Sequence, residues 1–349
     1  MINVKILTFF FAACLFLTSC AYHDSRETLS KQMFEHKSRT LAAWSGWQKK
    51  DIREKIVPAP DILLDYLHID NKISSYDKVT QPATQWQSFA DEVFQAIDEF
   101  PPEVKRHLNE HVIGIFLVSD LGSSAFTDII RDSTPPLGFI VLDSQSLNRK
   151  ANEWASWKEN TPFSPYSKME TRVIIESKVG DTRKNAISYI ILHELGHLVG
   201  VTKEVHANWW DKGNHNDYPF ASISWTRRND SLASKWDDTF QNRSRVRFYA
   251  NEKSQLAGDE RTSIYANLEK TDFVSLYAAT GSYDDFAETY AMYAHVVLQK
   301  RPWELEVLRE GKPIFRMTEP ILQARSKYKR AFLAKLFETK SQAEVTLTH

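Results

Sequence analysis

The chain has 349 residues, of which 44 are basic and 45 acidic, so its formal net charge is −1. A balance this close to neutral, without basic runs interleaved with aromatic residues, argues against a nucleic-acid partner. The content of 42% hydrophobic residues, with ten tryptophans and thirteen tyrosines, is typical of a folded protein and excludes a disordered chain.

The N-terminal segment has the pattern of an export signal. Lys5 precedes an apolar stretch, residues 6–17, that is too short for a permanent membrane-spanning helix. The segment Leu17-Thr18-Ser19-Cys20 resembles the lipobox of bacterial lipoproteins, in which signal cleavage leaves an acylated N-terminal cysteine. We therefore expect removal of residues 1–19 and a membrane anchor through lipid on Cys20. A plain cleaved signal peptide and an uncleaved anchor are the alternatives.

The resemblance also bears on location and on stability. Ala21, in place of the aspartate that often retains such proteins at the inner membrane, implies the outer membrane, facing the periplasm or the cell surface. Cys14 and Cys20 are the only cysteines, so a lipidated mature chain has no disulfide and depends on its core. We expect residues 20–59 to be a tether with an N-terminal helix and residues 60–345 to be one domain.

The next segments predict helices followed by strands. Helical spacing of apolar residues indicates amphipathic helices from Thr28 to Trp47 and from Trp86 to Phe100, and a shorter helix follows over 103–111. Three apolar runs rich in branched residues then predict strands at residues 112–118, 137–142 and 172–175. Since these runs precede a long helix, we expect a small sheet packed on that helix.

That long helix is predicted from Asn185 to Val199, with Asp181 or Thr182 as its cap and Gly200 at its end. Its residues are mostly apolar apart from the group His193-Glu194-Leu195-Gly196-His197, which matches the pattern H-E-x-x-H. Histidines four apart share one helix face and can bind one zinc ion, while the glutamate can act as general base on a water. Polar groups in a buried helix cost free energy unless a hydrogen bond or a metal ion compensates them, and this favours a zinc site over a chance match.

A third protein ligand is predicted further along the chain. A histidine at residue 203 would complete the metzincin pattern, but that residue is Lys203, and His206 comes three residues too late. Asp284 and Glu288 lie four apart on a helix expected from Ser282, as N-cap, to about Gln299. Either acid can supply the ligand.

The segment Asp284-Asp285-Phe286-Ala287-Glu288 resembles the E-x-F-A-E stretch of gluzincins of the anthrax lethal factor group. The resemblance covers perhaps forty residues in two blocks. It implies that Asp284 is the ligand and Glu288 the support of a ligand histidine, although Asp284 is one methylene shorter than the usual glutamate. With Glu288 as ligand, the helix would have to be shifted. The group also has a tyrosine seven residues before the ligand acid, here Tyr277, which is either an oxyanion donor or a core residue.

His295 and the segment 107–111 also contain possible metal ligands, but we expect neither to bind the metal. His295 lies too far along the second helix to share the metal. The group His107-Leu108-Asn109-Glu110-His111 reads as the inverted pattern H-x-x-E-H, but the charged residues around it predict a solvated short helix.

Residues 201–270 are expected to be irregular, and the tail from Pro302 to Phe337 to form further helices. The resemblance thus implies an α+β, zincin-like domain with a small mixed sheet and a mainly helical C-terminal part, in which residues 137–144 form the edge strand that binds substrate. The expected function is a zinc peptidase with one catalytic ion that acts on peptides or proteins. The alternatives are a non-catalytic zinc-binding lipoprotein that acts as a binding module and an amidase on a cell-wall amide.

Overall fold

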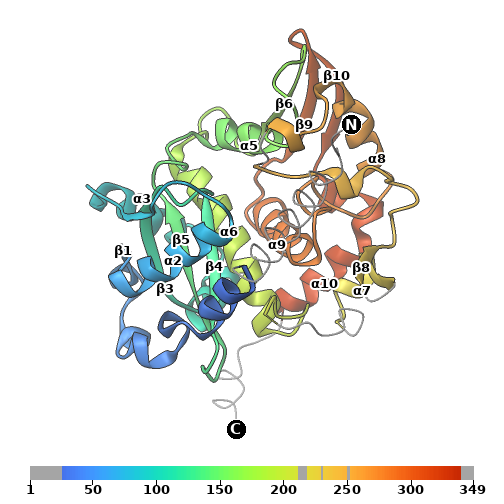
Figure 1. Ribbon diagram of the computed structural model, residues 1–349. Helices are drawn as coiled ribbons and strands as arrows, with labels where there is room; N and C mark the ends of the chain where they lie inside the picture. The colour runs from blue at the N-terminus through green and yellow to red at the C-terminus, as the bar shows by residue number, and fades with distance from the viewer. Residues whose placement is uncertain (1–25, 211–217, 229–230, 250–251, 339–349) are drawn as a thin grey trace, which may run out of the picture.

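A computed structural model of the chain describes residues 26–210, 218–228, 231–249 and 252–338 (Figure 1). The predicted signal segment and Cys20 lie outside these residues. Within the described part of the chain, no helix is both long enough and apolar enough to cross a membrane. Helices and a mixed sheet are both present, so the prediction of an α+β chain is confirmed.

The first sheet has the strand order β1-β3-β5-β4, with β2 paired to the remaining part of β3. Its strands are β1 (Ile56–Pro58), β2 (Gln81–Pro82), β3 (Val112–Ser119), β4 (Ala125–Ile130) and β5 (Leu137–Asp143). Strands β1, β3 and β5 run parallel, while β4 is antiparallel to β5. The predicted strands at 112–118 and 137–142 are therefore present, in one mixed sheet.

The edge of this sheet differs from the prediction. Strand β5 lies between β3 and β4, so residues 137–144 are not the edge strand; β4 is. Sequence patterns missed β4 because Thr127 and Asp128 interrupt its apolar residues.

Helices cover both faces of the sheet. One face contacts α2 (Asp61–Ile73) and the segment before it, through a core cluster that includes Trp44, Tyr66, Phe116 and Phe139. The other face contacts a larger core built with α3 (Gln87–Asp98), α4 (Pro102–His111), α5 (Ala151–Asn160) and α6 (Arg183–Thr202). Because β3 and β5 are buried on both faces, they have continuous apolar runs in place of polar alternation.

A second sheet differs from two predictions, those for the strand at 172–175 and for the C-terminal tail. Its strands, in the order β10-β9-β6, are β6 (Met169–Ile174), β9 (Glu304–Arg309) and β10 (Lys312–Thr318), all antiparallel. The strand predicted at 172–175 therefore belongs to a different sheet from the other two. The tail is not only helical, because Gly311 at φ 77° permits a tight turn and the segment folds back as a hairpin, seen at the upper right of Figure 1.

The remaining labelled elements are α7 (Ala221–Ser224), α8 (Arg261–Leu268), α9 (Ser282–Met292), α10 (Lys327–Glu338), β7 (Trp225–Arg228) and β8 (Ser231–Ser234). The predicted second helix starts at Ser282, but Gly281 is its N-cap, and the helix continues as π-helix over Tyr293–Leu298. In the N-terminal part, residues 26–35 form one helix, and short 3₁₀ turns replace the rest of the helix predicted to Trp47.

The predicted short helix over 103–111 is α4, but it is not solvated. His107 and His111 are buried, and His107 Nδ1 lies 2.9 Å from the Tyr290 hydroxyl. The charged neighbours that suggested solvent exposure, such as Lys105, lie on the other side of the helix. Burial lowers the pKa of His107 to about 3, so this ring is neutral at ordinary pH.

Candidate metal centre

The residues of the H-E-x-x-H pattern lie on α6, a helix that is buried over most of its length. Thr182 caps it by accepting a hydrogen bond from the Asn185 amide, whereas Asp181 bonds the Asn152 amide instead. The helix does not end at Gly200 but continues to Thr202. Glycine is needed at residue 200 for another reason, because a Cβ there would meet His206 Nε2 at 2.1 Å.

Helices α6 and α9 pack against each other at very short range, side by side at the centre of Figure 1. The contact is made at Gly196, where a Cβ would lie 2.8 Å from the Ala287 Cα. A larger residue would therefore push the two backbones apart. Gly196 lies between His193 and His197 in the sequence, so the closest approach of α9 is at the level of the two imidazoles.

This packing brings His193, His197 and Asp284 together, with one potential ligand atom of each within 4.8 Å of the others. The Nε2 atoms of the two histidines are 3.1 Å apart, and Asp284 Oδ1 is 3.8 Å from His197 Nε2. Bonds of about 2 Å to a tetrahedral zinc ion place ligand atoms roughly 3.3 Å apart. The three residues could therefore hold one zinc ion.

Glu288 faces the other side of the His193 ring. Its Oε1 lies 2.9 Å from His193 Nδ1, so the carboxylate can orient the ring whose Nε2 faces His197. Lys158 of α5 donates to the same oxygen at 2.6 Å, and the Ser275 hydroxyl donates to Oε2 at 2.7 Å. Glu288 is therefore surrounded by donors and directed at His193, while Asp284 lies on the side of the two imidazoles where a metal ion could bind.

The two carboxyl groups have opposite pKa shifts. Burial alone would raise the pKa of Glu288, but the Lys158 ammonium and His193 outweigh it and hold that pKa well below its usual range. At Asp284, burial raises the pKa, and His193 and the Thr280 hydroxyl, which donates to Oδ2 at 3.2 Å, oppose it only in part. A cation beside Asp284 would favour its charged form.

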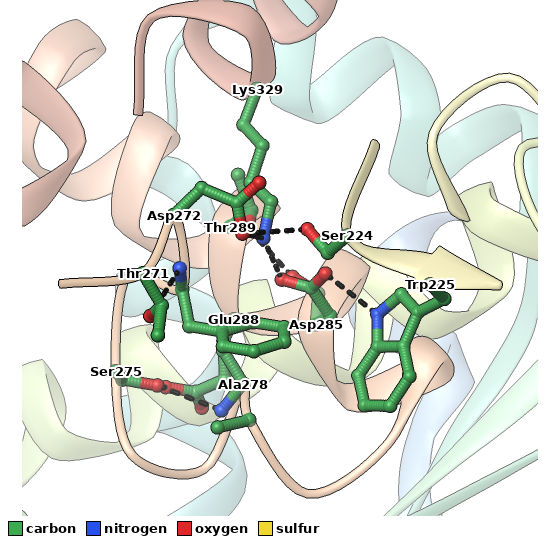
Figure 2. Close-up of polar contacts among 12 residues, drawn as sticks. Ser224, Trp225, Thr271, Asp272, Ser275, Ala278, Asp285, Glu288, Thr289 and Lys329 are labelled. Atoms are coloured by element: carbon green, nitrogen blue, oxygen red, sulfur yellow. Dashed lines mark hydrogen bonds and ion pairs between the residues drawn. The ribbon is translucent and has the colours of Figure 1, made fainter. Parts of the chain in front are cut away.

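A buried ion network fixes the first turn of α9 (Figure 2). Lys329 of α10, fully buried, donates to Asp285 Oδ1 at 2.6 Å and lies 3.4 Å from Asp272. The Trp225 indole donates to the other Asp285 oxygen at 3.0 Å. Since Asp285 follows Asp284 directly, these contacts anchor the turn that carries the candidate ligand.

Glu194 points into a cleft between α6 and the edge strand. The cavity there measures about 470 Å³, and its lining includes Glu194, His197, Asp284 and, from β4, Phe126 and Thr127. Burial raises the pKa of Glu194, and the adjacent His193 and Thr127 oppose this shift. The arrangement is that of a carboxylate beside the potential ligands, able to exchange a proton with a molecule in the cleft.

Tyr277 lies next to the histidines. Its ring centroid is 5.5 Å from that of His193, and the Lys158 ammonium lies 4.3 Å from its ring centre. Burial, and after it the charge of Asp284, hold the pKa of the Tyr277 hydroxyl well above its usual range, so it stays a hydrogen-bond donor. The side chain is half-buried, next to His193 but not fully enclosed by the core.

His206 and His295 are not part of the group. His206 is buried with its Nδ1 2.8 Å from the Ala207 carbonyl oxygen, and His295 Nε2 lies 2.8 Å from the Ile175 carbonyl oxygen. In the described residues, the only group of three or more side chains suited to a metal ion is that of His193, His197 and Asp284.

Sequence reasoning missed the residues that hold the candidate ligands in place: Lys158, Ser275, Thr280, Asp285 and Lys329. Lys158 lies within Trp154-Ala-Ser-Trp-Lys-Glu, where only the apolar neighbours hint at burial. Its contact with Glu288, 130 residues away, follows from the tertiary fold.

Comparison of the chain with protein-family models, with curated proteins and with solved structures found no match.

Glu288→Gln should destabilise the metal-free protein by about 3 kcal/mol, because it leaves the Lys158 ammonium buried without a counter-charge. Lys158→Met combined with Glu288→Gln should recover most of this loss. Since the pKa of Glu288 is depressed, its contribution should be present above pH about 4.5, its usual pKa, and decrease as the pH falls further.

Denaturant unfolding with a chelator present measures this effect. The control is Glu310→Gln, which breaks the exposed Lys168–Glu310 pair and should cause no measurable change. Equal stability of Glu288→Gln and the wild type would show that the buried pair does not hold the site together.

Proposed function

We propose that the protein is a zinc-dependent peptidase of zincin-like fold. The observation that carries the proposal is the group His193, His197 and Asp284 with Glu194 beside it in an open cleft. Two imidazoles and a carboxylate form a donor set that suits zinc, and a fourth position open to the cleft is a property of catalytic sites. A purely structural site has no use for an adjacent base such as Glu194.

The contact of Glu288 with His193 is consistent with the same proposal. Zinc-bound histidines usually place a carboxylate on the opposite ring nitrogen, which fixes the tautomer and ring orientation. Glu288 has this position relative to His193. We therefore assign Asp284 as third ligand and Glu288 as the orienting group, in agreement with the resemblance to gluzincins.

The residues of the chain then have separate roles in peptide hydrolysis. Zinc would supply a positive charge that acidifies a water molecule to a pKa of about 7. Glu194 accepts a proton from water as general base and passes it to the leaving amine. The Tyr277 hydroxyl is a candidate donor to the oxyanion that develops on the attacked carbonyl, a contact typically worth about 3 kcal/mol.

The edge strand offers a binding site for the substrate backbone. β4 is paired with β5 on one side only, and its residues Phe126 and Thr127 line the cleft beside Glu194. An extended peptide can add to such an edge through main-chain hydrogen bonds. This mode fits peptides and unfolded segments of proteins as substrates.

We also propose a lipid anchor on Cys20, based on the segment Leu17-Thr18-Ser19-Cys20. This would place the enzyme at a membrane, with the outer membrane favoured by Ala21. Cells that express the chain should incorporate labelled palmitate into it, and Cys20→Ser should abolish the label. Equal labelling of both forms would refute the anchor.

Glu194→Gln should lower peptide turnover by at least about a hundredfold while the protein keeps its fold and bound zinc, because it removes the base but no ligand. Tyr277→Phe should lower kcat by about a hundredfold with little change in KM. Hydrolysis of a mixture of quenched fluorescent peptides, with zinc measured on the same samples, tests both.

Glu170→Gln, on the exposed side of β6, is the matched control and should retain full activity. Undiminished cleavage by Glu194→Gln would refute the mechanism. Cleavage of cell-wall amides but not of peptides would instead favour an amidase, and zinc binding without any hydrolysis would favour a binding module.

A further inference from the structure

The cleft extends from the candidate metal centre into an apolar pocket. One wall carries Glu194, His197 and Asp284; the opposite wall comes from the helix of residues 26–35 and from α2. Much of the lining is aromatic or aliphatic and includes Met33, Ile73, Phe126, Trp209, Trp210 and Tyr283. Such a pocket beside a reaction centre can accept a side chain of the substrate.

The pocket has acidic groups but no strong base. Among the described residues that line it, none is a lysine or an arginine. Asp70 of α2 lies in the wall opposite the metal centre and is largely buried. Burial, and after it the charge of Asp128, raise the pKa of Asp70 to about 6, and no cation or donor in the described residues offsets this shift. A positive charge brought into the pocket would stabilise the Asp70 carboxylate.

Asp128 of β4, which also lines the pocket, already has partners for its carboxylate. Its Oδ2 is 3.0 Å from Arg39 Nε and accepts from the Tyr66 hydroxyl, and its Oδ1 accepts from the indoles of Trp209 at 3.0 Å and Trp210 at 2.9 Å. Arg39 is buried against Asp128 and stacks 4.2 Å from the Trp210 ring centre. Asp128 is therefore paired, whereas no cation among the described residues is paired with Asp70.

The hydrogen bonds to Asp128 also determine which groups of Trp209 and Trp210 remain available to a molecule in the pocket. Because both indole N–H groups donate to Asp128, the rings offer mainly carbon surface and π-electrons to an occupant. Aromatic faces attract cations, with a larger effect when the cation is desolvated. An aliphatic stem with a charged end matches this combination of apolar walls and a carboxylate.

We propose that this pocket binds a lysine or arginine side chain of the substrate, with Asp70 as its counter-charge. The proposal rests on the proposed peptidase function and names the class of peptide that the site selects. The stem of the side chain packs on the aromatic wall and its charge pairs with the Asp70 carboxylate. A glutamate at the same substrate position is rejected, because it would bring a second negative charge beside Asp70.

The test uses the zinc-loaded full chain in mild detergent and quenched decapeptides with one position fixed as Lys, Arg, norleucine or Glu. At one position relative to the cut, Lys or Arg should be preferred over norleucine by about tenfold or more in kcat/KM. Asp70→Asn should remove this preference and leave cleavage of norleucine peptides within about twofold. Asp65→Asn, at an exposed residue of α2, is the matched control and should change nothing.

A second arm separates this proposal from the proposed function. Binding of the same peptides to Glu194→Gln, with and without Asp70→Asn, is followed by tryptophan fluorescence. Cation-selective binding that needs Asp70, without hydrolysis by the wild type, would support the pocket and refute the peptidase. Hydrolysis with no preference for Lys or Arg at any position would refute the pocket alone, and neither binding nor hydrolysis would refute both.

Discussion

The close contact of α6 with α9 is the constraint on which the rest of the site depends. Gly196 leaves no side chain between the helices, so the backbone of α9 lies directly against the turn that carries His193 and His197. A helix held at this distance presents Asp284 and Glu288, one turn apart, to the two imidazoles from different sides. The glycine within the H-E-x-x-H sequence is thus as necessary to the geometry as the histidines.

Buried charge surrounds this contact and is arranged in pairs. Lys158 neutralises Glu288 behind the site, and Lys329 neutralises Asp285 at the start of α9. Unpaired charges at these depths would be costly, so each pair restricts the position of the helices that carry it. The cleft is different: Asp128 is paired with Arg39, but no lysine or arginine of the described residues forms an ion pair with Glu194, Asp284 or Asp70. The acids behind the site are thus paired with lysines, whereas the cleft has carboxylates that could interact with a metal ion or a substrate.

Local patterns predicted the elements that have a strong local signal. The apolar runs of β3 and β5 and the long helix α6 were found because burial on both sides gives an unbroken apolar sequence. β4 was missed because its polar residues face the cleft. The β9–β10 hairpin was taken for helix although its strands pair locally across the turn at Gly311. Likewise, the H-E-x-x-H spacing predicted that His193 and His197 share one face of α6. The four-residue spacing of Asp284 and Glu288 predicted that these acids share one face of α9. Lys158 could not be predicted, since its contact with Glu288 exists only in the fold.

The central claim is that His193, His197 and Asp284 hold one zinc ion, and zinc content tests it most directly. The full chain, purified in mild detergent and equilibrated with zinc, should contain about one zinc ion per chain by mass spectrometry. His193→Ala combined with His197→Ala should contain almost none while keeping the helical circular dichroism signal. A well-folded wild type without zinc, or a double variant with as much zinc as the wild type, would contradict the account.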